Sequence, residues 1–455
     1  MQKNGILVIN NKHAGNLLIS RTTIPAARQL WLVRLWLGVT WFCAGPIRLA
    51  ARLLHRRMGA EPHRFDERLG MASVGVGVGV GVGVGVGVGG RVIWIHAASL
   101  GEVAQTEPIV RYFIQNGSVV LITTTTKAGA DWVAKELPSV IHQYAPIDTA
   151  QSVRRFLAAW NIHAAIFIEG DFSPRLTLET QARDIPMALL NARHSRTRAR
   201  FPTVFGALLR GFALVTCRSD AVARDIRTMG VADTRVHVVP DLRIGATRKS
   251  VAADLVDHMR THIGARPVWV AASTHQGDEA VVLSAHRTVL QKLPNALLIL
   301  VPRHPKRGAP LEDASQALAL VTLRRSSGGT ISTSTQVYIA DTLGELDAYL
   351  QLAPVTFMGG SFGNEGGHNP YEPACHGAAI LSGPNIRNFI EAYDALSDAG
   401  AAELVQDPAA LGHRLVDLMQ SDTAQTMGAA GARFIANSVN SMPRTIALLK
   451  DALEI

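Results

Sequence analysis

Two glutamates lie just beyond apolar segments that have the character of buried strands. Glu102 closes the segment HAASLGE at residues 96–102, and Glu169 follows the apolar run at residues 164–168. In open α/β sheets, ligands bind at the carboxyl ends of the strands, so both glutamates are candidate site residues. A carboxylate at Glu102 could accept the proton of a hydroxyl nucleophile. The alternative is an ordinary helix-start carboxylate, stabilised only by the helix dipole.

A glycine-rich stretch late in the chain is a second candidate site. Residues 359–373 read GGSFGNEGGHNPYEP, after a strand-like segment and before a predicted helix. Backbone N–H groups at such a helix start can hold a phosphate, although a structural turn has the same composition. No Gly-x-Gly-x-x-Gly motif follows the first predicted strand, and no Walker loop occurs, which argues against a nicotinamide enzyme or a P-loop protein.

These residues need a folded body, and the composition predicts one. The chain has 455 residues, of which 47% are hydrophobic and 18% charged, so a disordered protein is excluded. Three widely spaced cysteines exclude a disulfide scaffold and a structural zinc site, and we expect no metal or other cofactor. Strand-like and helix-like segments alternate in two series, with the predicted strands at residues 91–96, 119–123, 164–168, 187–190, 214–216, 267–272, 296–301, 337–340, 355–358 and 379–381.

Two such series predict an α/β protein with two Rossmann-like lobes and a cleft between them. We expect a membrane anchor at residues 1–60, a linker at 61–90, an N-terminal lobe at 91–245 and a C-terminal lobe at 246–455. The linker contains an uninterrupted Val-Gly alternation at residues 74–89, which is unsuited to a stable strand and carries no chemistry.

Basic charge is concentrated at the amino end. Residues 1–60 hold nine of the 45 Lys and Arg residues and none of the 36 Asp and Glu residues, so the rest of the chain is formally neutral. A nucleic-acid-binding protein is expected to carry its basic surface on the folded body, so no nucleic-acid partner is predicted. A basic, hydrophobic end favours a membrane surface instead.

Residues 30–54 are apolar and contain three tryptophans, but Arg34 and Arg48 lie within this segment and Pro46 interrupts it. Either a short membrane span at residues 35–50 or an amphipathic segment in the headgroup layer fits this pattern. A core helix of the first lobe is a third interpretation. The basic residues that follow would keep this side cytoplasmic.

Several motifs together resemble one family, the 3-deoxy-D-manno-octulosonic acid (Kdo) transferases of lipopolysaccharide assembly. The matching motifs occur in the family's order and cover most of the chain, at residues 66–70 (DERLG), 96–102, 123–129 (TTTTKAG), 169–174 (EGDFSP), 191–193 (NAR), 272–275 (ASTH), 302–305 (PRHP), 341–346 (DTLGEL) and 359–373. The resemblance implies a GT-B glycosyltransferase fold, CMP-Kdo as donor, a lipid A precursor (lipid IVA) as acceptor, inversion at the transferred sugar, and a place on the cytoplasmic side of the inner membrane.

The same resemblance assigns catalytic roles. Glu102 is the implied proton acceptor, as the last residue of the family's Ser-x-Gly-Glu motif, and Glu169 is the implied transition-state stabiliser. Arg243 stands where the family has lysine and would contact the departing phosphate; a surface arginine without a role is the alternative. Asp171 and Ser173 replace the second glutamate and the tryptophan of the family motif. These departures keep open a catalytically impaired relative, and another GT-B enzyme such as a nucleotide-sugar epimerase is the other alternative.

The resemblance places the CMP-sugar site in the second lobe. The residues it implies are Pro302, Arg303, Leu343, Gly344, Glu345, Asn369, Pro370, Tyr371 and Glu372. Arg303 would meet the phosphate and Glu372 the ribose hydroxyls. Ser273 and Thr274 could add phosphate hydrogen bonds, although plain helix caps would look the same. His304 and His368 lack the spacing of zinc ligands and are expected to support loops.

Overall fold

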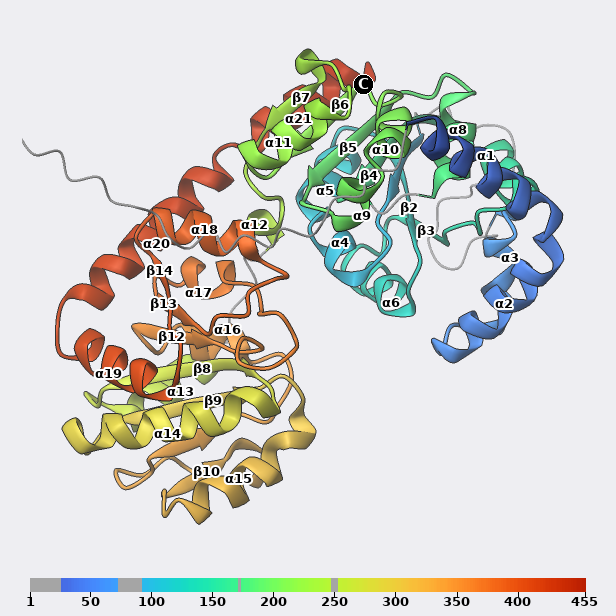
Figure 1. Cartoon of the computed structure of the whole chain (residues 1–455). Coiled ribbons are helices and arrows are strands. Elements are labelled where there is room, and N and C mark those ends of the chain that lie inside the picture. Colours follow the sequence, from blue (N-terminus) through green and yellow to red (C-terminus); the bar gives the residue numbers. More distant parts are fainter. Residues whose placement is uncertain (1–25, 73–91, 171–172, 247–252) are drawn as a thin grey trace, which may run out of the picture.

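Two parallel seven-stranded sheets form the body of the computed structural model, which describes residues 26–72, 92–170, 173–246 and 253–455 (Figure 1). The first sheet has the order β3-β2-β1-β4-β5-β6-β7, and its strands are β1 Val92–His96, β2 Val119–Thr124, β3 Ile141–Tyr144, β4 Ile162–Ile168, β5 Met187–Ala192, β6 Leu214–Cys217 and β7 Val236–Val238. The second has the order β10-β11-β9-β8-β12-β13-β14, with β8 Val268–Thr274, β9 Leu297–Pro302, β10 Thr322–Arg324, β11 Val337–Ile339, β12 Val355–Met358, β13 Ala379–Ser382 and β14 Ala402–Leu404.

This architecture confirms the predicted α/β fold with two Rossmann-like lobes. In each sheet the strand order reverses beside the first strand, between β1 and β4 and between β8 and β12. Ligands bind at such switch points in open parallel sheets. Every predicted strand is present, whereas β3, β7, β10 and β14 were not predicted. These four are short strands at or near the sheet edges, and they lack the continuous apolar run of a fully buried parallel strand.

Helices cover both faces of the first sheet. Along β1, Ile93 and Ile95 belong to one apolar cluster while Val92 and Trp94 belong to another, so alternate side chains enter two separate layers. The helices of this lobe are α4 Leu100–Ala104, α5 Glu107–Gln115, α6 Lys127–Glu136, α7 Ala150–Ala159, α8 Pro174–Gln181, α9 Arg196–Arg200, α10 Pro202–Leu209 and α11 Asp220–Thr228. The short helix α4 therefore begins directly beyond the carboxyl end of β1.

The chain crosses between the lobes twice. After α12 (Arg243–Ala246) it enters the second lobe, whose helices are α13 Ala253–Ile263, α14 Gln276–Lys292, α15 Gly308–Ala317, α16 Leu346–Leu350, α17 Tyr371–Cys375, α18 Ile390–Asp398, α19 Pro408–Met419 and α20 Thr423–Val439. The last helix, α21 (Met442–Leu453), returns to the first lobe (Figure 1). Leu449 and Leu453 are fully buried in the cluster that contains Ile93. The predicted C-terminal lobe, residues 246–455, is therefore too long, because its final helix packs in the first lobe.

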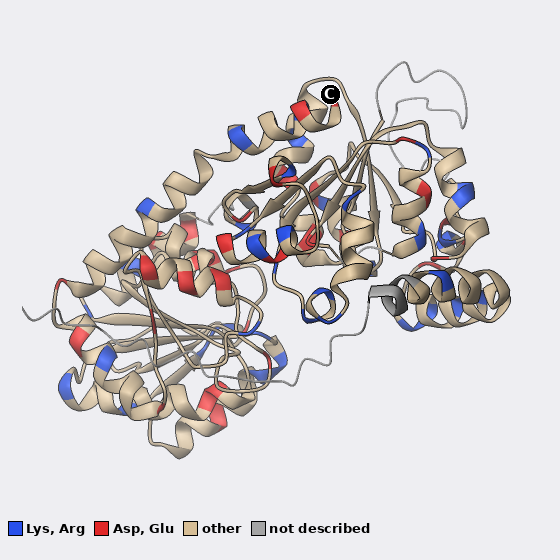
Figure 2. Ribbon diagram, turned by 45° about the horizontal axis from the view of Figure 1, so that its top comes forward, with Lys and Arg blue, Asp and Glu red and all other residues tan. Residues whose placement is uncertain are grey.

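Two helices at the amino end lie against the first lobe. They are α1 (Ala26–Phe42) and α2 (Ala44–Arg57), and they meet at an angle of 81°. Both helices carry arginines and neither carries an acidic residue (Figure 2). Trp36 Nε1 donates to Asp148 Oδ2 over 2.6 Å, and the buried guanidinium of Arg175 donates to Thr40 Oγ1 over 3.0 Å. α1 is therefore attached next to the start of α8, the helix that follows the Glu169 loop.

The segment after α2 is folded rather than a free linker. It forms a short 3-10 turn and α3 (Phe65–Arg68). Glu67 accepts a hydrogen bond from the backbone N–H of Tyr144 over 2.7 Å, and Arg68 donates to the carbonyl of Thr125 over 2.7 Å. The linker interpretation therefore fails for residues 61–72, because they pack on the edge of the first sheet. The Val-Gly repeat at residues 74–89 lies outside the described residues.

Candidate functional site

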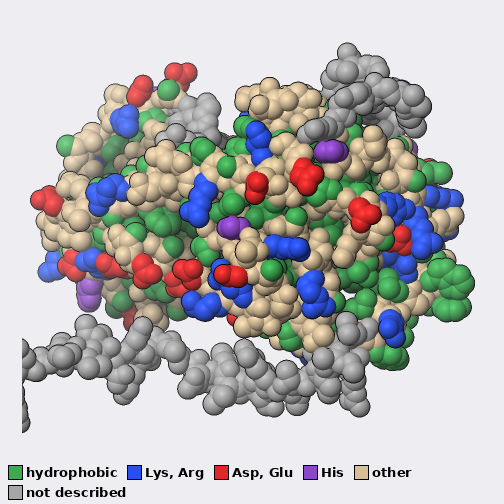
Figure 3. All heavy atoms as spheres, turned by 90° about the horizontal axis from the view of Figure 1, so that it is seen from above, with side chains coloured by type: hydrophobic (Ala, Val, Ile, Leu, Met, Phe, Trp, Pro, Cys, Tyr) green, Lys and Arg blue, Asp and Glu red, His purple; other side chains and the backbone are tan. Residues whose placement is uncertain are grey.

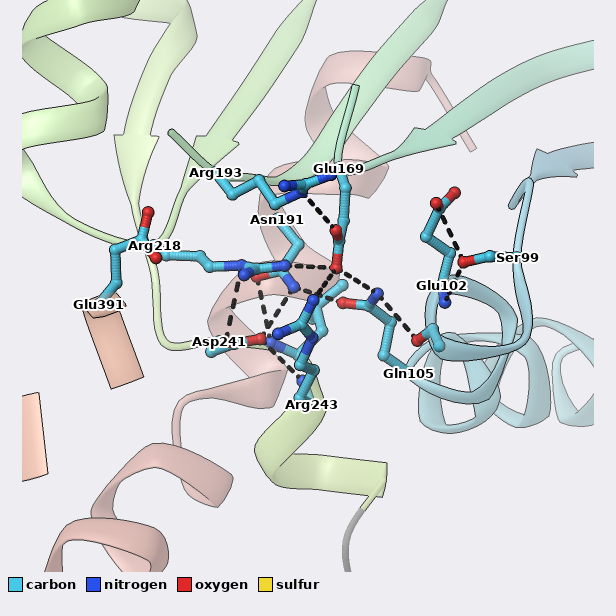
Figure 4. A network of polar contacts seen from close by, with 12 residues as sticks. Ser99, Glu102, Gln105, Glu169, Asn191, Arg193, Arg218, Asp241, Arg243 and Glu391 are labelled. Atoms are coloured by element: carbon cyan, nitrogen blue, oxygen red, sulfur yellow. Dashed lines mark hydrogen bonds and ion pairs between the residues drawn. The ribbon is translucent and has the colours of Figure 1, made fainter. Parts of the chain in front are cut away.

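Glu169 is the centre of a buried polar network at the carboxyl end of β4 (Figure 4). Its Oε1 atom accepts hydrogen bonds from Arg218, from Arg243 Nη2 over 2.6 Å and from Gln105 Nε2 over 2.9 Å. Its Oε2 atom lies 2.8 Å from Arg193 Nε. The side chain of Glu169 is only 4% exposed, so three arginines compensate one buried carboxylate.

The protonation state of Glu169 follows from these contacts. Burial by itself would raise the pKa of Glu169, but the charges of Arg218 and Arg243, the hydrogen bond from Gln105 and the charge of Arg193 together lower it to about 2. The carboxylate is therefore ionised at neutral pH and holds the arginines in place. It is too weakly basic to accept a proton from a hydroxyl group at that pH.

The backbone around this network takes an uncommon conformation. Glu169 has φ of 61° and Asn191, at the end of β5, has φ of 59°. Asparagine tolerates this left-handed region, but for glutamate it costs on the order of 1 kcal/mol, and such strain is concentrated at functional sites. Asn191 Nδ2 donates to Asp241 Oδ1 over 2.8 Å, which ties the end of β5 to the segment before α12.

Arg243 connects this network to the second lobe. Its backbone N–H donates to Asp241 Oδ1 over 3.0 Å, while its guanidinium contacts Glu169 and lies 5.0 Å from the centre of the Phe389 ring. Phe389 precedes α18 in the second lobe. A nearby interlobe contact is the hydrogen bond from the His194 N–H to Glu391 Oε1, at 3.1 Å. The structure thus places the predicted residue Arg243 beside Glu169, at the junction of the lobes.

Replacement of Arg243 tests whether its charge or its shape matters. We expect Arg243→Lys to retain most turnover, because an ammonium group can still compensate Glu169, and Arg243→Ala to lose roughly tenfold to a hundredfold. Steady-state kinetics of the two variants would measure this difference. Arg227, which forms an ion pair with Asp233 away from the network, is the control position for loss of an arginine. Equal turnover of Arg243→Ala and wild type would mean that Arg243 is a surface arginine without a catalytic role.

Glu102 lies beside the network, on α4. It is 6% exposed, its Oε2 accepts a hydrogen bond from the Ala98 N–H over 2.7 Å, and its Oε1 accepts one from Ser99 Oγ over 3.1 Å. Ser99 in turn caps the helix through the Glu102 N–H. Glu102 therefore has the contacts of a residue at a helix start, as the alternative interpretation expects. They also fix the carboxylate at the carboxyl edge of the first sheet.

Gln105 links Glu169 to α4, the helix that carries Glu102. It is 1% exposed, and its Nε2 donates both to the carbonyl of Gly101, over 3.2 Å, and to Glu169 Oε1, over 2.9 Å. A buried amide with both contacts fixes the position of α4 relative to the arginine network. Glu102 and Glu169 therefore lie at the same edge of the sheet, on segments that Gln105 joins.

The glycine-rich stretch of the second lobe differs from our expectation. The backbone N–H groups of Gly360, Ser361 and Phe362 donate to the carboxylate of Asp278, over 2.7, 3.1 and 3.0 Å. Asp278 is fully buried at the start of α14 and also accepts from the His275 N–H over 2.9 Å. These loop amides therefore hold an internal carboxylate, and a phosphate would need other donors on this edge.

The first glycines of this stretch are required for packing. A Cβ atom on Gly359 would lie 2.7 Å from the Cα of Thr274, and one on Gly360 would lie 2.9 Å from the His368 ring. Gly360 also has φ of 69°. The loop after β12 therefore packs closely on the end of β8, and its glycines have a structural reason apart from any ligand.

The predicted residue Glu345 is engaged by the protein itself. Its carboxylate accepts hydrogen bonds from Arg325 Nη2 over 2.9 Å, from Tyr349 over 2.8 Å and from Thr342. Burial would raise the pKa of Glu345, but these hydrogen bonds, led by that of Arg325, lower it to about 2. Its neighbour Leu343 is 76% exposed, so this loop presents an apolar side chain rather than the carboxylate.

The start of α17 brings the two predicted half-sites together. Asn369 Oδ1 accepts from the Tyr371 N–H over 3.2 Å, and Pro370 and Glu372 flank the buried Tyr371. Burial and the charge of Asp241 raise the pKa of Tyr371. An effect of Asp241 on Tyr371 means that this segment of the second lobe faces the arginine network of the first.

The remaining predicted donor residues lie at the carboxyl ends of β8 and β9. Arg303 is exposed and follows the buried Pro302, and its N–H donates to the carbonyl of Thr274 over 3.0 Å. Ser273 has φ of 54°. The Oγ1 atom of Thr274 is buried and has no hydrogen-bond partner among the described residues. Thr274 therefore offers an unsatisfied hydroxyl group on the edge where ligands bind in this fold.

Several residues of the network had no predicted role. Arg193, Arg218, Asn191 and Gln105 contact Glu169 or its partners, and Asp278 organises the second lobe. The available signal was positional, since Glu169, Arg193 and Arg218 each follow a strand of the first sheet by at most one residue. Among the described residues, no group of three or more His, Cys, Asp or Glu side chains is placed to hold a metal ion.

Comparison with known proteins gives consistent results. A family profile described as 3-deoxy-D-manno-octulosonic-acid transferase (kdotransferase) matches residues 63–246. The 3-deoxy-D-manno-octulosonic acid transferase of Haemophilus influenzae is 30% identical over 376 residues, which cover 80% of this chain and 87% of that protein. The transferase of the same description from Bordetella pertussis is 32% identical over 383 residues, 79% and 87% of the two chains.

A solved structure shows the same fold at low sequence identity. The crystal structure of a glycosyltransferase from Rickettsia africae superposes with a TM-score of 0.55 and 12% identity, and the match covers 80% of this chain and 99% of that chain. This similarity supports the GT-B fold alone, since identity at that level does not carry function.

Proposed function

Since this chain belongs to the Kdo transferase family, we propose that it moves Kdo from CMP-Kdo to a hydroxyl group of a lipid A precursor, with Glu102 as proton acceptor. The chain is a Kdo glycosyltransferase of lipopolysaccharide biosynthesis. The curated relatives share its family and are transferases, so the nucleotide-sugar epimerase alternative has no support from them. A catalytically impaired relative is the alternative that experiment must address.

The observation that carries the mechanism is that Glu102 and Glu169 lie at one edge of the first sheet, on segments joined by Gln105. Glu102 would take the proton of the acceptor hydroxyl as its oxygen attacks the anomeric carbon, with inversion. Glu169 would act through its arginines, because an ionised carboxylate that holds three guanidinium groups preorganises positive charge. Both CMP-Kdo and the transition state are anionic, so fixed cations favour binding and reaction.

The second lobe would bind the donor. Arg303, Ser273 and Thr274 lie together at the ends of β8 and β9, and we assign them to the phosphate. We assign Glu372, at the start of α17, to the ribose, because a carboxylate can accept hydrogen bonds from the ribose hydroxyl groups. Glu345 would shape the loop around Leu343 and Gly344 rather than contact the nucleotide directly, because Arg325 and Tyr349 already use its carboxylate.

The acceptor would approach from a membrane that contacts α1 and α2. Among the described residues no single helix is long and apolar enough to cross a bilayer, although α1 and α2 pass this test as a bent pair. Their exposed side chains include Trp31, Trp41, Phe42, Leu49 and Leu53. Figure 3 shows apolar side chains gathered beside basic ones at the right end of the molecule, where α1 and α2 lie in Figure 1.

A basic recess at this end would suit the phosphate groups of a lipid. It lies between the helix pair and α7, has a volume of about 410 Å³, and is lined by Arg48, Arg154 and Arg155 together with Trp41. Indole rings favour the bilayer interface and arginines attract anionic headgroups. We therefore propose that α1 and α2 lie in the cytoplasmic interface of the inner membrane rather than span it.

Vesicle binding tests this placement. Burial of an aromatic side chain in lipid is worth about 1.5–3 kcal/mol, so Trp41→Ser with Phe42→Ser should weaken binding to vesicles with anionic phospholipid at least roughly tenfold. Val321→Ser, at an exposed apolar residue of the second lobe, is the control and should bind as the wild type does. Co-sedimentation with vesicles measures both variants. Unchanged binding of the double variant would contradict the placement.

The transferase itself is tested by release of CMP from CMP-Kdo, with and without a tetraacylated lipid A precursor. We expect release that depends on the lipid, together with a lipid product heavier by the mass of Kdo. No release from a protein that binds CMP would identify an impaired relative or a different acceptor, and Ser173 and Arg243 would then be the positions to restore.

A further inference from the structure

Two histidines of the second lobe share one hydrogen bond. His275 follows β8 and caps α14, and His368 lies in the loop after β12. Their Nε2 atoms are 2.9 Å apart, the ring planes differ by 8°, and the ring centroids are 5.1 Å apart. That centroid distance is the one expected for rings that meet edge to edge in one plane. One Nε2 atom must donate and the other accept, so the pair holds a single proton between these two atoms.

Fixed contacts hold the pair in this geometry. Asp278 accepts from the N–H groups of both His275 and Gly360, and the ring of His368 packs directly on the Cα of Gly360. Asp278 therefore binds the backbone of His275 directly and the start of the loop that carries His368. A geometry set in this way does not depend on a ligand.

The charged and titratable groups around the pair come from three elements. On the His275 side, the His304 ring stands edge-on with centroids 5.7 Å apart, and Glu365 Oε1 lies 3.9 Å from His275 Nδ1. Burial, with the charges of His275, Arg303 and His304, lowers the pKa of His368 to about 4, against the opposite effect of Asp278. His368 is therefore neutral near neutral pH in the ligand-free protein.

The pair lies where a phosphate would need donors. The amides of Gly360, Ser361 and Phe362 are bound to Asp278, so side chains on this edge are candidate phosphate donors. Arg303 and the unsatisfied hydroxyl of Thr274 are next to His304 and His275 in the chain, and the charge of Arg303 acts on His368. A negative charge on this edge would favour the charged form of His368, against the burial and the cations that lower its pKa.

We propose that the His275–His368 pair takes up one proton as the departing phosphate of CMP gains its second negative charge. In this step the bond between the anomeric carbon and the phosphate oxygen breaks, and its electron pair remains on the oxygen. The acceptor's hydroxyl proton goes to Glu102, whereas the proton of the pair comes from solvent and returns there when CMP dissociates. The imidazolium so formed would stabilise the dianionic leaving group. This inference rests on the proposed donor site.

Calorimetry of ligand binding to the full chain tests it without turnover. Three ligands are compared at pH 7.5 in buffers of different ionisation enthalpy: CMP, the methyl ester of CMP with one phosphate charge, and cytidine. A phosphate monoester is mostly dianionic at this pH, because its second pKa is about 6. We expect about one proton to be taken up with CMP, and close to none with the other two ligands.

Variants assign the proton to the pair. His275→Asn and His368→Asn should each abolish most of the uptake with CMP, whereas His304→Asn, the matched control, should retain it. Uptake that persists in both pair variants, or that is lost in His304→Asn alone, would overturn the assignment. Should the variants not fold, the wild type still decides: its affinity for CMP must fall roughly tenfold from pH 7 to pH 8 while that for the methyl ester stays level. A wild type that binds none of the three ligands would instead contradict the proposed donor site, and this inference with it.

Discussion

Glu102→Ala should lower turnover on the order of a hundredfold or more and leave CMP binding nearly intact. A sugar hydroxyl is a poor nucleophile until a base takes its proton, and Glu102 is the carboxylate held at the edge of the first sheet beside the arginine network. The proposed nucleotide site is in the other lobe, so its affinity should be independent of this residue. Steady-state kinetics with CMP-Kdo and CMP binding by calorimetry measure the two effects separately.

Glu102 also caps a helix, so a control must separate capping from catalysis. Ser99→Ala removes the N-cap side chain of α4 and keeps the carboxylate of Glu102. Each variant should lose about 1 kcal/mol of the free energy of unfolding, since that is the usual value of a cap. Turnover should stay within a fewfold of wild type for Ser99→Ala. If the two variants lost turnover equally, Glu102 would be a structural residue and the proton acceptor would lie elsewhere.

Glu169→Gln should be the most destabilising single change in the site. It leaves three arginines around a neutral amide, and removal of one partner of a buried ion pair typically costs about 3–5 kcal/mol. Turnover should fall on the order of a hundredfold or more in the protein that remains folded, because the arginines lose their fixed positions. Chemical denaturation measures the first effect and kinetics the second.

Glu179 provides a matched control for this substitution. It also forms ion pairs with three arginines (Arg154, Arg175 and Arg183), but Arg154 is 62% exposed and Arg183 33%. Exposed pairs contribute about 0–1 kcal/mol, so Glu179→Gln should be mild. Similar destabilisation by both substitutions would contradict the role of burial at Glu169.

The effect of Glu169→Gln should depend on pH. The pKa of Glu169 is about 2 in the folded protein and its ordinary value is 4.5, so its stabilising contribution is complete above pH 4.5 and disappears as the pH falls towards 2. The difference in free energy of unfolding between wild type and Glu169→Gln should therefore be constant above about pH 5 and shrink below it. A difference that stays constant down to pH 3 would show that Glu169 is not the ionised partner of the arginines.

The sequence by itself determined the class of fold and placed the candidate residues Glu102 and Glu169 at one edge of a predicted sheet. Strands of a parallel sheet are buried on both faces, so they are continuous apolar runs that can be recognised without the structure. Glu102 and Glu169 follow such runs, and the carboxyl ends of parallel strands meet at one edge. The motifs that resemble the Kdo transferases rest on the same local pattern, and the family was correctly predicted from them.

Only the tertiary structure decided which charges meet. Arg193, Arg218 and Arg243 are separated from one another by about one strand–helix unit each, and their convergence on Glu169 follows from the order of β4, β5 and β6 in the sheet. The spacing of these residues along the chain does not reveal the order of the strands in the sheet. In the second lobe, the sequence of the glycine-rich loop could not reveal that Asp278, about 80 residues earlier, accepts hydrogen bonds from the first backbone N–H groups of that loop.

The C-terminal helix and the histidine pair have the same explanation. Leu449 and Leu453 fill the core of a lobe whose strands lie more than 200 residues earlier, and His275 meets His368 across 93 residues. The periodicity of apolar residues, helix caps and turns depends on residues a few positions apart, so these features can be recognised in the sequence. Contacts between residues far apart in the chain depend on how the sheets and lobes assemble, and this assembly positioned the charges and imidazoles of the site.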